Sequence, residues 1–136
     1  MSDLTSWFEQ QIQEWWADGA DFPTPPTNIY IALHTGDPGN DASANEVTAG
    51  DYSRAETQLS DWSVSGSAPT NVTNSVEIQF DAATSSWGTI SHISLWTSTQ
   101  GGGGNPIWEG DLNNAREIQD GDRFVFPADE FDADLD

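Results

Sequence analysis

The sequence contains no cysteine and no lysine, and each absence removes a class of function. Without cysteine the chain has no disulfide bridge, no thiolate zinc site and no cysteine nucleophile. Lysine plus arginine number 3 against 23 aspartate plus glutamate, which gives a formal net charge of -20 at pH 7. Because binding to a polyphosphate depends on cationic side chains that release counterions, we expect neither nucleic acid nor an anionic membrane as a direct partner.

Long apolar runs are also missing. No stretch approaches the roughly 18 residues of a membrane-spanning helix, and Met1 to Glu14 lacks the basic start and apolar stretch of a signal peptide. We therefore expect neither a transmembrane segment nor a Sec-type export signal. A length of 136 residues suits one hydrophobic core and is short for two. We predict a single domain over residues 1–136.

The acidic composition raises the question of disorder, because a hydrophobic content of 35% with this net charge is close to that of disordered chains. The 7 Trp, 6 Phe and 2 Tyr residues favour a folded domain with an acidic surface instead. The lack of lysine and the excess of aspartate over glutamate look like proteins of salt-accumulating halophiles. In about 1 M salt the Debye length is only about 3 Å, so we expect the fold to weaken at low salt.

One amphipathic helix is predicted within residues 1–19. Apolar residues recur at helical spacing from Leu4 to Trp16, after possible caps at Ser2, Asp3 or Thr5 and before Gly19 as a stop. The apolar stripe is wide and aromatic. We favour packing of this stripe on its own domain, with docking on a neighbouring subunit as the alternative. The candidate interface residues are Trp7, Phe8, Trp15 and Trp16.

A proline-containing connector over residues 20–27 follows, and residues 28–136 are predicted to be all-β. Short strands separated by turn residues, without helical patterns between them, favour an antiparallel β-sandwich of jelly-roll type. Alternation is clearest at Val76, Ile78 and Phe80, at Ile93 and Leu95, and at Phe131, Ala133 and Leu135. The predicted strands are Asn28–Thr35, Tyr52–Leu59, Asp61–Val64, Asn74–Phe80, Gly88–Thr97, Asn105–Leu112, Ala115–Ile118, Arg123–Phe126 and Glu130–Leu135.

Catalytic and metal-binding patterns are weak. His34 and His92 each lie inside a predicted strand, where a hydrogen-bonded structural histidine is expected. Ser91 and His92 are neighbours, so on a regular strand they point to opposite faces and form no nucleophile and base pair. The acidic loop from Asp37 to Glu46 lacks the EF-hand pattern, and Gly101 to Gly104 reads as a flexible turn. We predict no catalytic residue, no metal site and no cofactor.

Tryptophans on a β-scaffold form either a core or a platform for stacking on sugars. Core packing explains Trp62, Trp87, Trp96 and Trp108 as well as a platform does. Trp96 shares strand parity with polar His92, and Trp108 precedes an acidic stretch. We therefore take Trp96 and Trp108 as candidate exposed ligand contacts.

Several segments form a recognisable order of motifs. The most specific are Leu33 to Gly39, within a longer segment from Asn28, and Trp87 to His92. The others, in order, are Asn45–Val47, Gly50–Arg54, Asn74–Phe80, Ala82–Thr84 and Gly121-Asp122 through Phe124 and Phe126 to Leu135-Asp136. This order resembles that of small structural proteins of tailed bacterial and archaeal viruses, which implies membership of a virus particle and no catalytic residues. This sequence departs from many relatives in its acidity, its aromatic helix and the Gly101–Gly104 run. The acidity fits a virus of a halophilic archaeon.

Two functions follow as hypotheses. The first is a non-enzymatic virion protein, a capsid-surface decoration or turret-like component that contacts copies of itself as a homo-oligomer and neighbouring capsid or tail proteins. It would be assembled in the host cytoplasm at high salt, with the N-terminal helix and its aromatics or a sheet edge as the anchor. The second is a carbohydrate- or receptor-binding β-domain at the tail or its tip.

Overall fold

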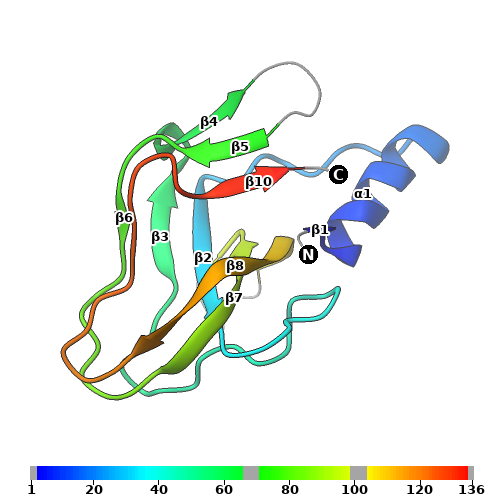
Figure 1. Ribbon diagram of the computed structural model, residues 1–136. Helices are drawn as coiled ribbons and strands as arrows, with labels where there is room; N and C mark the ends of the chain where they lie inside the picture. The colour runs from blue at the N-terminus through cyan, green and yellow to red at the C-terminus, as the bar shows by residue number, and fades with distance from the viewer. Residues whose placement is uncertain (1–2, 66–70, 99–103, 135–136) are drawn as a thin grey trace.

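The computed structural model describes residues 3–65, 71–98 and 104–134 (Figure 1). It is mainly β, with antiparallel sheets and one short N-terminal helix, which confirms the predicted fold class. The helix is α1 (Ser6–Ala17), and a single 3-10 turn spans Leu59–Asp61. The strands are β1 (Asp3–Leu4), β2 (Asn28–His34), β3 (Ala55–Gln58), β4 (Trp62–Ser65), β5 (Asn71–Asn74), β6 (Ile78–Gln79), β7 (Gly88–Trp96), β8 (Pro106–Ile118), β9 (Val125–Phe126) and β10 (Asp132–Asp134).

The strands form three antiparallel sheets. The largest has five strands in the order β1-β8-β7-β2-β3, the second has the order β10-β5-β4, and the third is the pair β6-β9. Figure 1 shows β10, β5 and β4 together above the long strands β7 and β8, with α1 beside the end of β8. The chain therefore returns at its C-terminal end to lie near its beginning.

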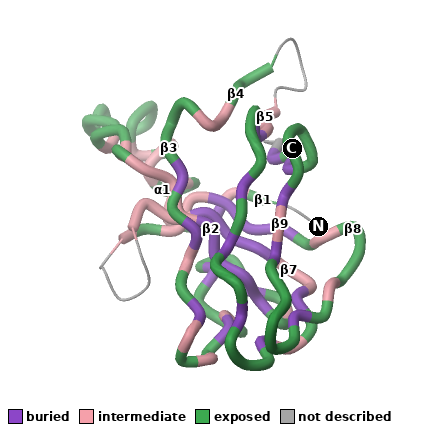
Figure 2. The backbone as a smooth tube through the Cα atoms, turned by 90° about the vertical axis from the view of Figure 1, so that its left-hand side faces the viewer, coloured by how far each residue is buried: buried purple, intermediate pink, exposed green. Residues whose placement is uncertain are grey.

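The core contains the inner strand β2 of the five-stranded sheet, which is largely buried (Figure 2), together with aromatic side chains from the other sheets. Ile31 and Leu33 on β2 are completely buried, as expected for a continuous apolar run. A chain of ring contacts, with centroids 5.0 to 5.8 Å apart, links the sheets. Each buried large apolar side chain stabilises the fold by about 1.5–3 kcal/mol. The rings in this chain are Phe80, Phe124, Phe126, Phe131, Trp62 and Trp108.

Helix α1 is fixed to β8 at its first turn. Thr5 is the N-cap: its hydroxyl accepts from the Phe8 amide at 3.4 Å and donates to the Pro106 carbonyl at 2.5 Å. The Thr5 amide donates to the Ile107 carbonyl at 3.0 Å. No residue of α1 is buried, although its start contacts β8. Among the described residues, no helix has the length and apolarity needed to cross a membrane.

Two predicted strands are in fact one. Residues 106–118 form the single strand β8, but its pairing with β7 is irregular. His92 pairs with Asp111 and Ile90 with Arg116, so Leu112 to Ala115 lie opposite Ser91 alone. This segment, which we call the β8 excursion (Leu112–Ala115), leaves the regular ladder in the manner of an extended β-bulge.

The observed strands differ from the predicted ones at several other positions because of the local backbone geometry. Val76 is exposed rather than sharing the buried face of Ile78 and Phe80, because residues 75–77 bend before β6 begins. The strand predicted from Tyr52 begins only at Ala55. The two-residue strand β1 was not predicted. The predictions for Ser2, for residues 101–103 and for Leu135 lie outside the described residues.

Candidate functional site

Half-buried and exposed aromatic side chains gather on and beside α1. Trp7 stacks on Phe8 with centroids 6.1 Å apart, and Phe22 meets the edges of Phe8 at 5.9 Å and Trp15 at 6.0 Å. Trp15 is 54% exposed and Trp16 68% exposed. We call this surface the aromatic face (Trp7, Phe8, Trp15, Trp16 and Phe22). The helical spacing predicted its first four members, whereas Phe22 was missed because it follows the helix stop.

An apolar groove continues from the aromatic face toward the sheets. Its volume is about 230 Å³, and every side chain lining it is apolar. Phe8 of the aromatic face forms part of its wall. The apolar lining of the groove differs from the acidic surface of the chain. The groove therefore offers a place to bury an apolar side chain of a partner. Other wall residues are Leu4, Leu59, Trp62, Ile107 and Trp108.

The charged side chains of α1 are both negative. Glu9 and Glu14 lie on α1, which has no basic residue. All three arginines lie in the described residues and are engaged elsewhere. Arg54 pairs with Glu46 at 2.9 Å, and Arg116 pairs with Glu130 at 2.7 Å. The third, Arg123, donates to the side-chain oxygen of Gln79 at 3.2 Å.

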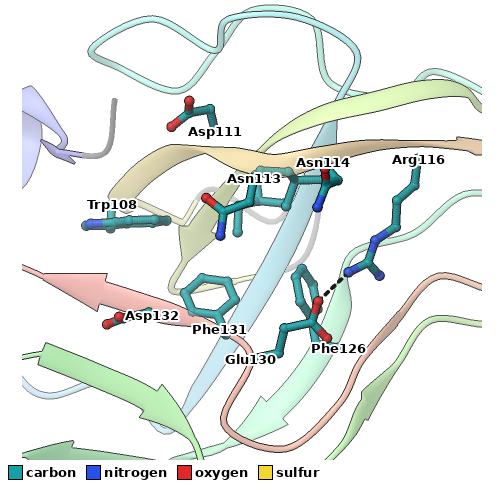
Figure 3. A pocket seen from close by; sticks show the side chains of 11 residues that line it. Trp108, Asp111, Asn113, Asn114, Arg116, Phe126, Glu130, Phe131 and Asp132 are labelled. Carbon is teal, nitrogen blue, oxygen red and sulfur yellow. Dashed lines mark hydrogen bonds and ion pairs between the residues drawn. The ribbon is translucent and has the colours of Figure 1, made fainter.

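A polar cleft of about 310 Å³ lies on the other side of Trp108, between β8 and the segment entering β10 (Figure 3). Asn113 and Asn114 of the β8 excursion point toward it from above, and Phe131 lies at its centre. The ion pair between Arg116 and Glu130 closes one end, as the dashed line in Figure 3 marks. We call this site the polar cleft.

The two tryptophans predicted as exposed ligand contacts differ in outcome. Trp108 is only 4% exposed, so its prediction as an exposed platform is wrong. On β8 it pairs with Leu95 and turns inward onto Phe131, which leaves only a small part of its surface in the polar cleft and the groove. Trp96 is half-buried: the Arg54 guanidinium lies 4.0 Å over its ring, and its indole N–H donates to Ser94 at 2.8 Å.

The histidines sit in hydrogen bonds. His34 is fully buried, its Nδ1 lies 2.8 Å from the Ala44 carbonyl oxygen, and its Nε2 lies 2.8 Å from the Ser94 hydroxyl. Burial lowers the pKa of His34 even though the Ala44 carbonyl and the Glu46 carboxylate act to raise it. The ring is therefore held neutral at pH 7.

The prediction that Ser91 and His92 point to opposite faces is wrong. The Ser91 hydroxyl lies 2.8 Å from Nδ1 of His92, because the register shift between Ile90 and His92 disturbs the regular alternation. Asp111 lies opposite His92 in the pairing of β7 with β8.

A family comparison covers nearly the whole chain. Residues 3–134 match the family described as "Podophage GP4 fiber I protein gp80". The chain belongs to this gp80 fiber protein family. The match supports a structural component of a phage virion, in agreement with the broader part of the predicted function and with a non-enzymatic role. A search of curated proteins found no match.

In this gp80 family member, the end of the acidic loop after β2 is held by Tyr52 and Arg54, which follow it in the chain. The Glu46 carboxylate accepts from Nε and Nη2 of Arg54 and from the Tyr52 hydroxyl, each at 2.9 Å. Burial alone would raise the pKa of Glu46, but the hydrogen bonds and charge of Arg54 outweigh it and hold the pKa below its usual value. Within the described residues, no group of three histidine, aspartate or glutamate side chains is placed to hold a metal ion.

Proposed function

We propose that this chain is a structural subunit of a phage fiber, held in the particle by the aromatic face of α1. The observation that carries the proposal is the unburied aromatic surface, with Trp15 and Trp16 more than half exposed, on a chain whose family is described as a fiber protein. Aromatic side chains dominate interface energetics, and exposed clusters of this kind mark docking sites. The family description favours a fiber over a capsid-surface decoration or turret.

The partner is a neighbouring virion protein with an apolar pocket bordered by lysine or arginine. Charge complementarity supports this choice over a second copy of the chain. A second copy would bring Glu9 and Glu14 toward another acidic surface, and its two ion-paired arginines are not free to neutralise them. Like charges facing each other across an interface oppose association. The homo-oligomer expected from the sequence is therefore disfavoured through this face.

Incorporation into particles tests the proposal. We expect the double variant Trp15→Ala/Trp16→Ala to fold normally, because neither side chain is buried, and to fall about tenfold or more in copies per particle. Val64→Ala is the matched control, since Val64 is 75% exposed and lies on β4 rather than on α1. Copies are counted by mass spectrometry against the major capsid protein in separated heads and tails.

Two results would overturn the proposal. The first is unchanged incorporation of the double variant. The second is recovery of the wild-type chain from heads alone, which would return the assignment to a capsid decoration.

A further inference from the structure

The polar cleft is built by an irregularity in the strand pairing. The β8 excursion moves Asn113 and Asn114 out of the ladder, above the segment that carries Glu130 and Asp132. A regular β8 would give one residue opposite Ser91, and both carboxamides would then lie elsewhere. Such bulges commonly re-aim side chains next to binding sites.

From this geometry we propose that the polar cleft binds a neutral saccharide. Within the described residues, neither the Asn113 nor the Asn114 carboxamide forms a hydrogen bond, so each has both donors and acceptors available. The Glu130 and Asp132 carboxylates add acceptors for hydroxyl groups, although Glu130 also binds Arg116 and Asp132 accepts from Asn71 at 2.7 Å. Adjacent hydroxyls of a sugar ring match this set of groups.

The apolar part of the cleft also fits a sugar. Phe126, Phe131 and Trp108 line it, and only 3–4% of each residue is exposed. The exposed parts of these rings offer a small apolar surface beside the polar groups. A pyranose presents the same combination, since its C–H groups are apolar and its hydroxyls are polar.

The charges exclude acidic ligands. Among the described residues that line the cleft, the one cationic side chain is Arg116, which is committed to Glu130 at 2.7 Å and to the Val125 carbonyl at 2.6 Å. The carboxylates in the walls and the net charge of -20 repel an anion. The site therefore selects a neutral sugar over a uronic acid or a phosphorylated glycan.

The same excursion disfavours an extended peptide. A peptide adding to β8 as a further strand needs a continuous row of backbone donors and acceptors in regular register. Leu112 to Ala115 interrupt that row, and the side of β8 near Trp108 is already paired with β1. Saccharide binding through side chains does not depend on strand register.

Saturation-transfer NMR with the full chain tests the proposal. The probes are the methyl glycosides of glucose, galactose, N-acetylglucosamine and rhamnose, with glucuronic acid as the anionic comparison. We expect transfer to at least one neutral glycoside and none to glucuronic acid. In Asn113→Ala/Asn114→Ala the affinity should fall about tenfold or more, through the loss of several hydrogen bonds.

The controls separate this site from the fold and from the aromatic face. Asn105→Ala removes an exposed carboxamide just before β8 and should leave binding unchanged. The double variant Trp15→Ala/Trp16→Ala should also leave saccharide binding unchanged, even where the variant abolishes incorporation into particles. The proposal is overturned by no transfer to any neutral glycoside, by equal transfer to glucuronic acid, or by full binding in a folded Asn113→Ala/Asn114→Ala variant.

Discussion

The indole of Trp108 and the phenyl ring of Phe131 lie with their centroids 5.6 Å apart, and this contact joins two sheets. Trp108 belongs to β8 of the five-stranded sheet, and Phe131 comes directly before β10 of the three-stranded sheet. Trp108 also lines both the apolar groove and the polar cleft. The pair therefore separates the two candidate surfaces and stabilises the walls of both.

Removing the Phe131 ring should destabilise the whole domain. Phe131 contacts the rings of Trp62, Phe126 and Trp108, so Phe131→Ala leaves a large cavity between the sheets. We expect a loss of about 3–5 kcal/mol in the free energy of unfolding, measured by guanidinium denaturation. Val64→Ala, at an exposed position, should change it by no more than about 0.5 kcal/mol. A similar small change in both variants would contradict the bridging role of Phe131.

The two ion pairs should differ in their contribution to stability. The Arg54 and Glu46 side chains are only 6% and 14% exposed, whereas those of Arg116 and Glu130 are 34% and 43% exposed. Glu46→Gln leaves the Arg54 charge buried without its counterion and should cost about 3 kcal/mol or more. Glu130→Gln should cost less than about 1 kcal/mol, because solvent screens the pair. Equal losses in thermal or chemical unfolding would contradict this ranking.

Stability should fall as the pH drops from 7 toward 5 because of His34. Its pKa in the folded chain lies below the unfolded value, which is about 6.5, so the folded state favours the neutral ring. The stabilisation from this group is present above pH about 6.5 and is lost as the pH falls toward the folded pKa. In His34→Gln, unfolding measured across the same range should depend less on pH. An unchanged pH profile in that variant would show that another group titrates.

Low salt should weaken the fold. With a net charge of -20, surface carboxylates repel one another in dilute buffer and are screened in molar KCl. We expect the melting temperature to rise between the two conditions, by about 4 °C for each kcal/mol gained. Sucrose at matched osmolality, which screens no charge, should give a smaller rise. A melting temperature independent of KCl would contradict the salt dependence predicted from the composition.

Periodicity was enough to predict the regular elements. The aromatic helix and the buried strand around Ile31 and Leu33 follow directly from spacing and from a continuous apolar run. Thr5 proved to be the cap among three possible ones. The helix depends on contacts between residues close in sequence. Strand β2 pairs with the distant β3 and β7, but its burial is still visible as a continuous apolar run.

The candidate site depended on pairing between distant segments, which the sequence does not display. The β8 excursion arises from the register between β7 and β8, so neither the placement of Asn113 and Asn114 nor the Ser91 contact with His92 was predictable from alternation. From the sequence, the Trp108 side chain was expected at the protein surface because acidic residues follow it. Its actual environment is set by Phe131, which arrives from the end of the chain.

Zero-length cross-linking of purified particles with a carbodiimide tests the docking of α1 most directly. The reagent joins carboxylates to amines, and this chain contains no lysine, so a link from Glu9 or Glu14 to a lysine identifies another protein. We expect such links to one neighbouring fiber or tail protein, and their loss in Trp15→Ala/Trp16→Ala but not in Val64→Ala. Particles that contain the chain, yet show lysine links only from carboxylates remote from α1, would contradict docking through the aromatic face.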